Sequence, residues 1–272
     1  MTRKSPPCIV TIAGTDPSGG AGIQADIKVI SATGGYAASV ITALVAQNTQ
    51  GVQAIEAVSP DFVQKQIDSV FSDLAIKAVK IGMLHQASII EVIATALSTL
   101  KPEHIVLDPV MVAKDGSILL DLETIDFIKT HLLPHVYLIT PNIVEAEHLL
   151  NTSITTTTEM ESVAKQLGTQ FNLNVLLKGG HLQGTRSPDV LYTVQNNTCE
   201  WFHAERFQTR NTHGTGCSLS SAIASYLAQG YALPKAISTA KNYITHAIRS
   251  GAEHTIGQGN GPIDHFYFLD KL

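Results

Sequence analysis

The segment of this chain with the clearest chemical potential is Asn211-Thr-His-Gly-Thr-Gly-Cys-Ser218, which leads directly into an apolar run over residues 219–227. The small residues Gly214, Thr215 and Gly216 predict a turn at the start of a helix. Backbone N–H groups at such a start have no partner within the helix, and the helix dipole adds to their attraction for anions. The segment is therefore predicted to hold a phosphoryl group in transfer.

Cys217 lies in the first turn of that predicted helix. The field at a helix N-terminus favours the thiolate over the thiol, so a polarised side chain is expected beside the anion site. The alternative is ordinary: a free cysteine is most often a small buried hydrophobic residue, and glycine-rich helix starts are common. The other segments of the chain decide between these interpretations.

Five further segments rich in glycine or polar residues each follow a short apolar run that is predicted to be a strand. Ligands of doubly wound sheets bind at the carboxyl ends of the strands. Glycine, proline and asparagine end strands in any fold, but five such segments at one sheet edge favour a binding site. They are Gly14-Thr15-Asp16, Gly82-Met83, Asp108-Pro109, Thr140-Pro141-Asn142 and Lys178-Gly179-Gly180.

Asp108, Asn142 and Glu145 offer the oxygen atoms that Mg²⁺ prefers as ligands. Glu145 follows Asn142 by three residues, which places both on one face of a predicted helix. The same spacing fits a capping box with Asn142 as the N-cap, and the two roles are compatible. Lys178 would be well placed to neutralise a nucleotide phosphate, although an ordinary surface lysine is the alternative.

The turn from Gly14 to Gly22 predicts a close approach of backbone to a small substrate. It has neither the dinucleotide fingerprint nor the Walker spacing, so those two binding modes are disfavoured. The amide of Gln47 could pair with a heteroaromatic ring edge, although a turn residue is the simpler interpretation. Taken alone, Asp26 is interpreted as a solvated helix residue, and His213 as a residue that makes structural hydrogen bonds rather than a general base.

Composition excludes several classes of protein. The 272 residues, 44% of them hydrophobic, suit one large α/β domain, and no repeat, linker or charge block divides residues 1–272. A formal net charge of −5 without a basic run argues against nucleic acid as a partner. The apolar stretch before Gly14 is too short for a signal peptide or a membrane span, and three cysteines without metal spacing fit a reducing compartment. We expect a soluble, cytoplasmic protein.

Short apolar runs alternate with amphipathic ones, which predicts βαβ units and a parallel sheet. Residues 189–206 break this rhythm and predict an edge hairpin around residues 195–197, and a second hairpin-like piece is expected between residues 48 and 58. Predicted strands cover residues 8–13, 38–46, 78–81, 104–107, 137–140 and 175–178. Predicted helices cover residues 20–32, 60–71, 87–100, 122–131, 143–150, 159–170, 222–229 and 234–251.

Taken together, these segments resemble the ribokinase superfamily and, within it, the hydroxymethylpyrimidine/phosphomethylpyrimidine kinases of thiamine biosynthesis. The resemblance implies a three-layer α/β/α sandwich with a mostly parallel central sheet and a small edge hairpin. It also implies ATP and Mg²⁺, a homodimer, and a pyrimidine alcohol that is phosphorylated first on its hydroxymethyl oxygen and then on the resulting phosphate. The ordered matches are residues 11–26, 41–49, 80–83, 107–111, 140–142, 178–181, 211–218 and 259–266.

The resemblance also implies roles for individual residues. Cys217 replaces the Asp that serves most ribokinase-like sugar kinases as general base, and residues 112–119 would close over the site as a lid. Gln47 would hold the pyrimidine edge. The remaining implied positions are Gly14, Asp26, Met83 and Val110 around the substrate, Gly214, Thr215 and Gly216 around the transferred group, Lys178, Asn142 and Thr215 at the nucleotide, and Asp108 and Glu145 at Mg²⁺.

Two alternatives remain. A pyridoxal kinase is the first, but some members of that branch carry a cysteine in the lid where this chain has Ala113, and Gln47 suits an aminopyrimidine. The second is a pyrimidine-sensing protein without catalytic activity, which would be expected to have lost Cys217, Lys178 or Glu145. The chain continues only briefly after Pro262, so a fused second enzyme is not expected.

Overall fold

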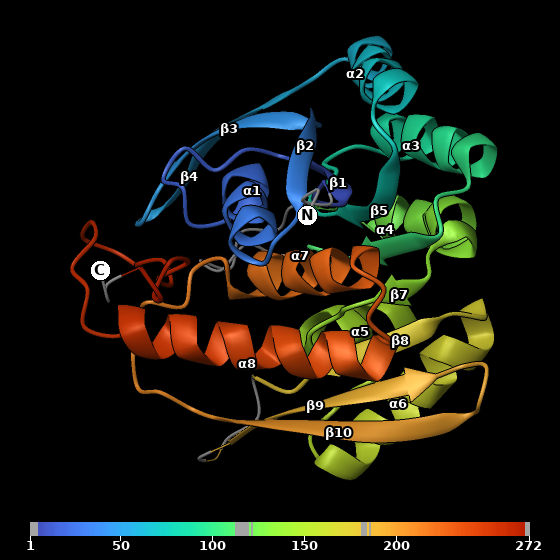
Figure 1. The fold of residues 1–272 in the computed structure, drawn as a ribbon. Coiled ribbons are helices and arrows are strands. Elements are labelled where there is room, and N and C mark those ends of the chain that lie inside the picture. Colours follow the sequence, from blue (N-terminus) through green and yellow to red (C-terminus); the bar gives the residue numbers. More distant parts are fainter. Residues whose placement is uncertain (1–4, 112–119, 121, 181–183, 185, 270–272) are drawn as a thin grey trace.

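An eight-stranded sheet in the order β10-β9-β8-β7-β6-β5-β1-β2 forms the middle layer of the molecule (Figure 1). The computed structural model describes residues 5–111, 120, 122–180, 184 and 186–269. Strands β2, β1, β5, β6, β7 and β8 run parallel, whereas β9 and β10 are antiparallel to their neighbours. Their bounds are β1 Cys8–Ala13, β2 Tyr36–Ile41, β5 Ile76–Ile81, β6 His104–Leu107, β7 Leu138–Ile139, β8 Asn174–Lys178, β9 Arg186–Thr193 and β10 Thr198–Glu205.

Helices cover both faces of this sheet. On one face α7 packs on β1, β5 and β6, flanked by α1 and α8, and on the other face α2, α3, α5 and α6 form the third layer (Figure 1). The bounds are α1 Gly22–Ala32, α2 Pro60–Asp73, α3 Ala87–Leu100, α4 Leu122–Phe127, α5 Ile143–Leu150, α6 Thr157–Phe171, α7 Thr215–Ala228 and α8 Leu233–Gly251.

Two hydrophobic cores lie on the two sides of the sheet. Successive strand residues point to opposite faces, and both faces are buried, so the strands read as continuous apolar runs. In β1, Ile9 joins the core beneath α1, α7 and α8, while Val10 joins the core beneath α2 to α6. Val106 and Leu107 divide in the same way in β6. The predicted three-layer, mostly parallel architecture is confirmed.

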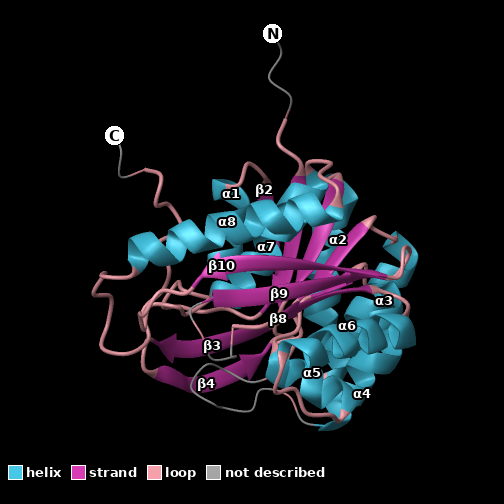
Figure 2. Cartoon of the chain, turned by 90° about the horizontal axis from the view of Figure 1, so that it is seen from below, coloured by secondary structure: helices cyan, strands magenta, loops and turns pink. Residues whose placement is uncertain are grey.

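The predicted strand over residues 38–46 is instead two strands. β2 ends at Ile41, and the backbone N–H of Thr42 donates to the Ala13 carbonyl while its hydroxyl donates to the Met83 carbonyl (2.8 Å). The chain then leaves the central sheet as the antiparallel hairpin β3 (Ala43–Asn48) and β4 (Gly51–Ala57), which stands apart from the other strands in Figure 2. This hairpin carries Gln47, so it positions one of the expected substrate residues.

The helix predicted over residues 122–131 also differs. Helix α4 gives way to a π-helical turn at Ile128–Leu132 and then to a 3-10 turn at Leu133–His135. Pro134 has no N–H to donate and limits the conformation of the residue before it, so a regular helix does not continue there. The edge hairpin predicted around residues 195–197 is confirmed as β9 and β10, with Asn197 in the left-handed region (φ 50°).

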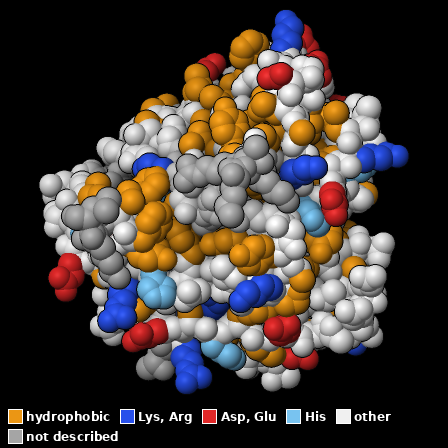
Figure 3. All heavy atoms as spheres, viewed as in Figure 1, with side chains coloured by type: hydrophobic (Ala, Val, Ile, Leu, Met, Phe, Trp, Pro, Cys, Tyr) orange, Lys and Arg blue, Asp and Glu red, His pale blue; other side chains and the backbone are white. Residues whose placement is uncertain are grey.

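On the side of the molecule seen in Figure 3, Lys and Arg side chains are scattered singly among acidic ones. Within the part of the chain that the structure describes, none of the helices combines the length and the apolar character needed to cross a membrane.

One ion pair lies wholly inside the protein. Lys80 on β5 and Asp26 on α1 are both fully buried, and the Lys80 ammonium lies 2.9 and 2.7 Å from the two Asp26 oxygens. Thr11 (2.6 Å) and Ser221 (2.7 Å) each donate a hydroxyl to the same carboxylate. A buried carboxylate has four lone-pair positions, and these four bonds occupy them. The network ties β1, β5, α1 and α7 together behind the sheet edge.

Substitution of Lys80 with Met is expected to destabilise the protein by about 3–5 kcal/mol, because it leaves the buried Asp26 charge without its counter-ion. Urea unfolding measures this as a lower midpoint. Lys77→Met at the exposed start of the same strand is the matched control and should change stability by no more than about 0.5 kcal/mol. Equal, small effects of the two substitutions would show that the buried pair is not a structural element.

Candidate active site

The polar segments predicted at strand ends do meet at one edge of the sheet. The five adjacent parallel strands β1, β5, β6, β7 and β8 all end there. Backbone bonds join the segments that follow them: the Gly14 N–H donates to the Met83 carbonyl (3.1 Å), and the Lys178 N–H donates to the Pro141 carbonyl (2.8 Å). The edge is thus a continuous floor rather than a set of independent turns.

The start of α7 lies against the glycine-rich turn that follows β1. Gly214 is the N-cap of α7 and adopts a left-handed conformation (φ 76°), which glycine allows at no steric cost. A Cβ at this position would overlap the carbonyl oxygen of Gly20. This contact brings the N–H groups of the first α7 turn over the sheet edge, where an anion would meet them. Of these groups, the Thr215 N–H also donates a long hydrogen bond to the Thr212 carbonyl (3.4 Å).

Asp108 and Lys178 face this helix start. The Lys178 ammonium lies 2.7 Å from the Asp108 carboxylate, which also accepts a hydrogen bond from the Thr140 hydroxyl (3.1 Å). A Cβ built on Gly216 would lie 3.3 Å from an Asp108 oxygen and 3.4 Å from the Lys178 nitrogen. The carboxylates of Asp108 and Glu145 raise the pKa of Lys178 despite its burial, so its charge is permanent. The Lys178 ammonium and the Asp108 carboxylate therefore lie side by side at the start of α7.

Glu145 and Asn142 form the capping box that their spacing predicted. The Glu145 N–H donates to the Asn142 side chain (3.0 Å), and the Asn142 N–H donates to the Glu145 carboxylate (2.7 Å). Burial, together with the nearby charge of Asp108, raises the pKa of Glu145 to about 7, although Lys178 acts in the opposite direction. Glu145 is thus a buried carboxylate whose negative charge is only partly compensated.

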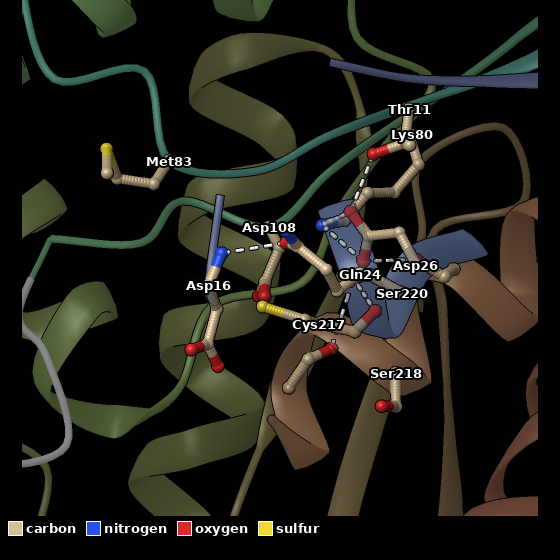
Figure 4. A network of polar contacts seen from close by, with 12 residues as sticks. Thr11, Asp16, Gln24, Asp26, Lys80, Met83, Asp108, Cys217, Ser218 and Ser220 are labelled. Carbon is tan, nitrogen blue, oxygen red and sulfur yellow. Dashed lines mark hydrogen bonds and ion pairs between the residues drawn. The ribbon is translucent and has the colours of Figure 1, made fainter. Parts of the chain in front are cut away.

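Cys217 differs from the expectation. Burial raises the pKa of its thiol to about 11; Asp26 and Asp108 add to this, whereas Lys80 and the Gly22 N–H act against it. Figure 4 shows Cys217 between Asp108 on one side and the Lys80–Asp26 pair on the other. The prediction that the helix field makes a thiolate in the free protein is wrong, because burial and two nearby carboxylates outweigh that field.

Asp16, His213 and Gln47 form a second polar cluster beside the α7 start. The His213 Nε2 atom lies 2.7 Å from an Asp16 carboxylate oxygen and 3.2 Å from the side-chain amide of Gln47. The interpretation of His213 as a maker of structural hydrogen bonds agrees with these contacts. His213 directly precedes Gly214, so its contact with Gln47 places the β3–β4 hairpin beside the start of α7.

The other expected substrate residues lie at different depths in the protein. Met83 packs against Gly14, where a Cβ would lie 2.7 Å from the Met83 methyl carbon, and Val110 is half-buried just beyond Asp108. Asp26 lies beneath this level, with all its lone pairs engaged by Lys80, Thr11 and Ser221. It therefore supports the floor of the site and has no oxygen left for a substrate. The expected lid, residues 112–119, and with it Ala113, lies outside the described residues.

Lys80 was not predicted as a site residue, and Asp26 was predicted to lie at the substrate or, taken alone, in solvent, although both left a signal in the sequence. Lys80 interrupts the apolar run of β5, so a buried partner is required. Asp26 stands with Ile23 and Ile30 at helical spacing on the buried face of α1, which contradicts the interpretation of a solvated residue. A charged residue at a core position of each of two elements, opposite in sign, indicates a buried pair.

A parallel sheet with an anion cradle at a helix start and a Lys–Asp pair at the strand ends defines an α/β kinase of the ribokinase type. The model of the phosphomethylpyrimidine kinase family matches residues 16–264. This chain therefore belongs to the phosphomethylpyrimidine kinase family.

Individual relatives agree with this. The hydroxymethylpyrimidine/phosphomethylpyrimidine kinase of Salmonella typhimurium is 46% identical over 259 residues, covering 95% of this chain and 97% of that protein. The thiamine biosynthesis bifunctional protein ThiED of Geobacter sulfurreducens is 47% identical over 264 residues, and the match covers 97% of this chain but only 53% of that longer protein. A pyridoxal kinase of Bacillus subtilis, solved with ADP, superposes with a TM-score of 0.89 at 33% identity, covering 97% and 99% of the two chains.

Substitution of Gly214 with Ala is expected to lower kcat/KM by about 100-fold, because an added Cβ overlaps the Gly20 carbonyl and displaces the α7 start, and a misplacement of about 1 Å costs that much. Gly230→Ala is the matched control: Gly230 also has a positive φ (88°), but nothing lies within 4 Å of its Cβ position. Steady-state kinetics of both variants measure the difference. Full activity of Gly214→Ala would exclude this helix start as the site of transfer.

Proposed function

We propose that this kinase uses ATP to phosphorylate 4-amino-5-hydroxymethyl-2-methylpyrimidine and then phosphorylates the resulting monophosphate to the diphosphate, as a step of thiamine biosynthesis. The observation that carries the proposal is the position of Asp108 and Lys178 directly above Gly216 in the cradle at the α7 start. The near full-length similarity to a relative named for both activities supports the choice of substrate.

Each part of the cradle has a distinct task in this proposal. The N–H groups of Gly214, Thr215 and Gly216 receive the migrating phosphoryl group, and Lys178 compensates charge on the nucleotide phosphates. Asn142 holds the start of α5 beside them. Positioning and charge compensation supply most of the rate in phosphoryl transfer, so these groups matter more than any proton transfer.

Cys217 is proposed as the group that accepts the proton of the substrate hydroxyl. With a thiol pKa of about 11, only a small fraction is ionised at neutral pH. Only this ionised fraction can accept the proton, so the reaction would run through the small thiolate population, which grows as the pH rises towards the thiol pKa. The second phosphorylation has an acceptor that is already anionic, so it needs no such base.

Mg²⁺ fits the donor set of Asp108 and Glu145. Mg²⁺ keeps several waters and takes only one or two carboxylates from a protein, and the described residues hold no group of three or more His, Cys, Asp or Glu side chains placed to bind a metal. The charge of buried Glu145, which Lys178 compensates only in part, is what a divalent cation would balance. When bound, the ion would neutralise charge on the phosphates.

Gln47, Met83, Gly14 and Val110 are proposed to surround the pyrimidine ring, with Gln47 at its polar edge. From the family resemblance we also propose a homodimer located in the cytoplasm. Phosphorylation of pyridoxal is a second candidate activity, supported by the close superposition on the Bacillus subtilis pyridoxal kinase.

A coupled ATP assay that offers the pyrimidine alcohol, its monophosphate and pyridoxal in parallel tests this proposal. Turnover of both pyrimidines, with kcat/KM well above that for pyridoxal, is the expected result. Turnover of pyridoxal alone would replace the proposal with the second candidate.

Substitution of Cys217 with Ala is expected to slow the first phosphorylation by about 10²–10⁴-fold, the usual contribution of a general base, and to slow the second much less. In the unsubstituted protein kcat/KM for the alcohol should rise between pH 7 and 9, since the thiol pKa lies above that range, and the variant should lose this rise. Cys199→Ala on β10 serves as the control. Equal losses in the two reactions would count against a role of Cys217 as general base. Cys217 would then have a positioning role only.

A further inference from the structure

We propose that His213, held by Asp16, fixes the orientation of the Gln47 amide, so that its NH₂ group is the one presented to the substrate. This inference rests on the proposed contact between Gln47 and the pyrimidine ring. It makes His213 a positioning residue that determines which heteroaromatic rings are accepted.

One ring nitrogen of His213 has two polar neighbours. The His213 Nε2 atom lies 2.7 Å from an Asp16 carboxylate oxygen, and the same atom lies 3.2 Å from the nitrogen of the Gln47 amide. The side chains of His213 and Asp16 are only 12% and 2% exposed, so water competes little for these contacts.

The proton on this nitrogen can be assigned from Asp16. Burial would raise the pKa of that carboxyl, but hydrogen bonds from His213, Ser18 and Ala21 lower it to about 2. An ionised carboxylate only accepts hydrogen bonds, so the Nε2 atom of His213 must carry a proton. This holds for the neutral and for the protonated imidazole.

A protonated ring nitrogen has no lone pair and cannot accept a hydrogen bond from the Gln47 NH₂ group. Two donors that face each other at 3.2 Å do not form a hydrogen bond. The oxygen and nitrogen of an amide have almost the same shape, so the hydrogen-bond network decides which of them faces a neighbour. Half a turn about the last bond of the side chain places the Gln47 oxygen at His213, and the NH₂ group then points away from it.

The dyad that sets this orientation is rigid. The Asp16 carboxylate accepts hydrogen bonds from the Ser18 N–H (2.9 Å), the Gly20 N–H (3.2 Å) and the Ala21 N–H (2.7 Å). The ring of His213 packs so closely on Gly20 that a Cβ there would lie 2.5 Å from a ring carbon. Neither partner can turn without opening the glycine-rich turn.

The consequence is a preference for one class of ring. An NH₂ group donates, so the facing edge of the substrate must carry an acceptor, such as an unprotonated ring nitrogen. A ring that offers a C–H or N–H at that position leaves a buried donor without a partner, which costs about 10- to 100-fold in affinity. By fixing the orientation of the Gln47 amide, His213 thus determines which rings bind.

The first test reads the protonation of His213 in the unsubstituted protein. The ¹⁵N chemical shifts of the His213 ring, with the resonances assigned from His213→Phe, report which nitrogen carries the proton. A proton on Nε2 is expected. A neutral ring with the proton on Nδ1 alone would overturn the proposal.

The second test is a double-substitution cycle of His213→Phe and Gln47→Ala, read as Kd and KM for the pyrimidine alcohol. A pyridine analogue, in which a C–H replaces the ring nitrogen beside the amino-bearing carbon, is measured in parallel. His213→Phe should weaken binding of the pyrimidine about 10-fold, with kcat much less affected, and should have no further effect once Gln47 is absent. The analogue should bind the unsubstituted protein about 10- to 100-fold more weakly than the pyrimidine does, and Gln47→Ala should remove most of that difference. His246→Phe on the exposed side of α8 is the matched control.

The outcomes separate two failures. If Gln47→Ala leaves pyrimidine binding unchanged, the proposed contact of Gln47 is wrong and this inference fails with it. If Gln47→Ala weakens binding but His213→Phe does not, or if the His213 effect persists without Gln47, the contact stands and the orienting role of His213 is refuted.

Discussion

The close contact between the Gly20 carbonyl and Gly214 is the constraint on which the site depends. No side chain fits between the two turns, and Gly214 must hold a positive φ. Asn211 reinforces this arrangement, because its side-chain NH₂ donates to the carbonyls of Gly251 (2.8 Å) and His254 (2.7 Å). The helix start is thereby held from both sides, and its N–H groups are organised before any anion arrives. Such preorganisation avoids a cost of reorientation during the reaction.

Charge pairing behind and beside the helix start sets its electrostatic character. Lys80 with Asp26, Lys178 with Asp108, and Lys241 with Asp189 form three buried or nearly buried pairs. Burial raises the pKa of the Cys217 thiol, and the two lysines near it offset this little because each is paired with an aspartate. A negatively charged phosphoryl group would meet backbone N–H groups and the Lys178–Asp108 pair, whereas the Lys80 and Lys241 pairs lie farther from the helix start in their own carboxylate contacts.

The spacing of hydrophobic residues predicted most of the helices and strands. The helices over residues 87–100 and 143–150 have the bounds that their apolar spacing predicted, and the capping box of Asn142 and Glu145 was readable from three-residue spacing. The prediction of a single strand over residues 38–46 was wrong, because a continuous apolar run does not show where a chain leaves its sheet. That point is decided by two bonds of Thr42 to Ala13 and Met83, which are distant in sequence.

The order of segments along the chain determined by itself the three-layer class and the family, because each segment needs only local residue types: glycine for tight turns, small residues at a helix start, polar residues after apolar runs. Tertiary structure alone decided the state of the side chains. The pKa of Cys217, the full burial of Asp26 against Lys80, and the meeting of Asp16, His213 and Gln47 depend on burial and on distances between residues up to 197 positions apart. Solvation and charge act through space, so a linear pattern does not contain them.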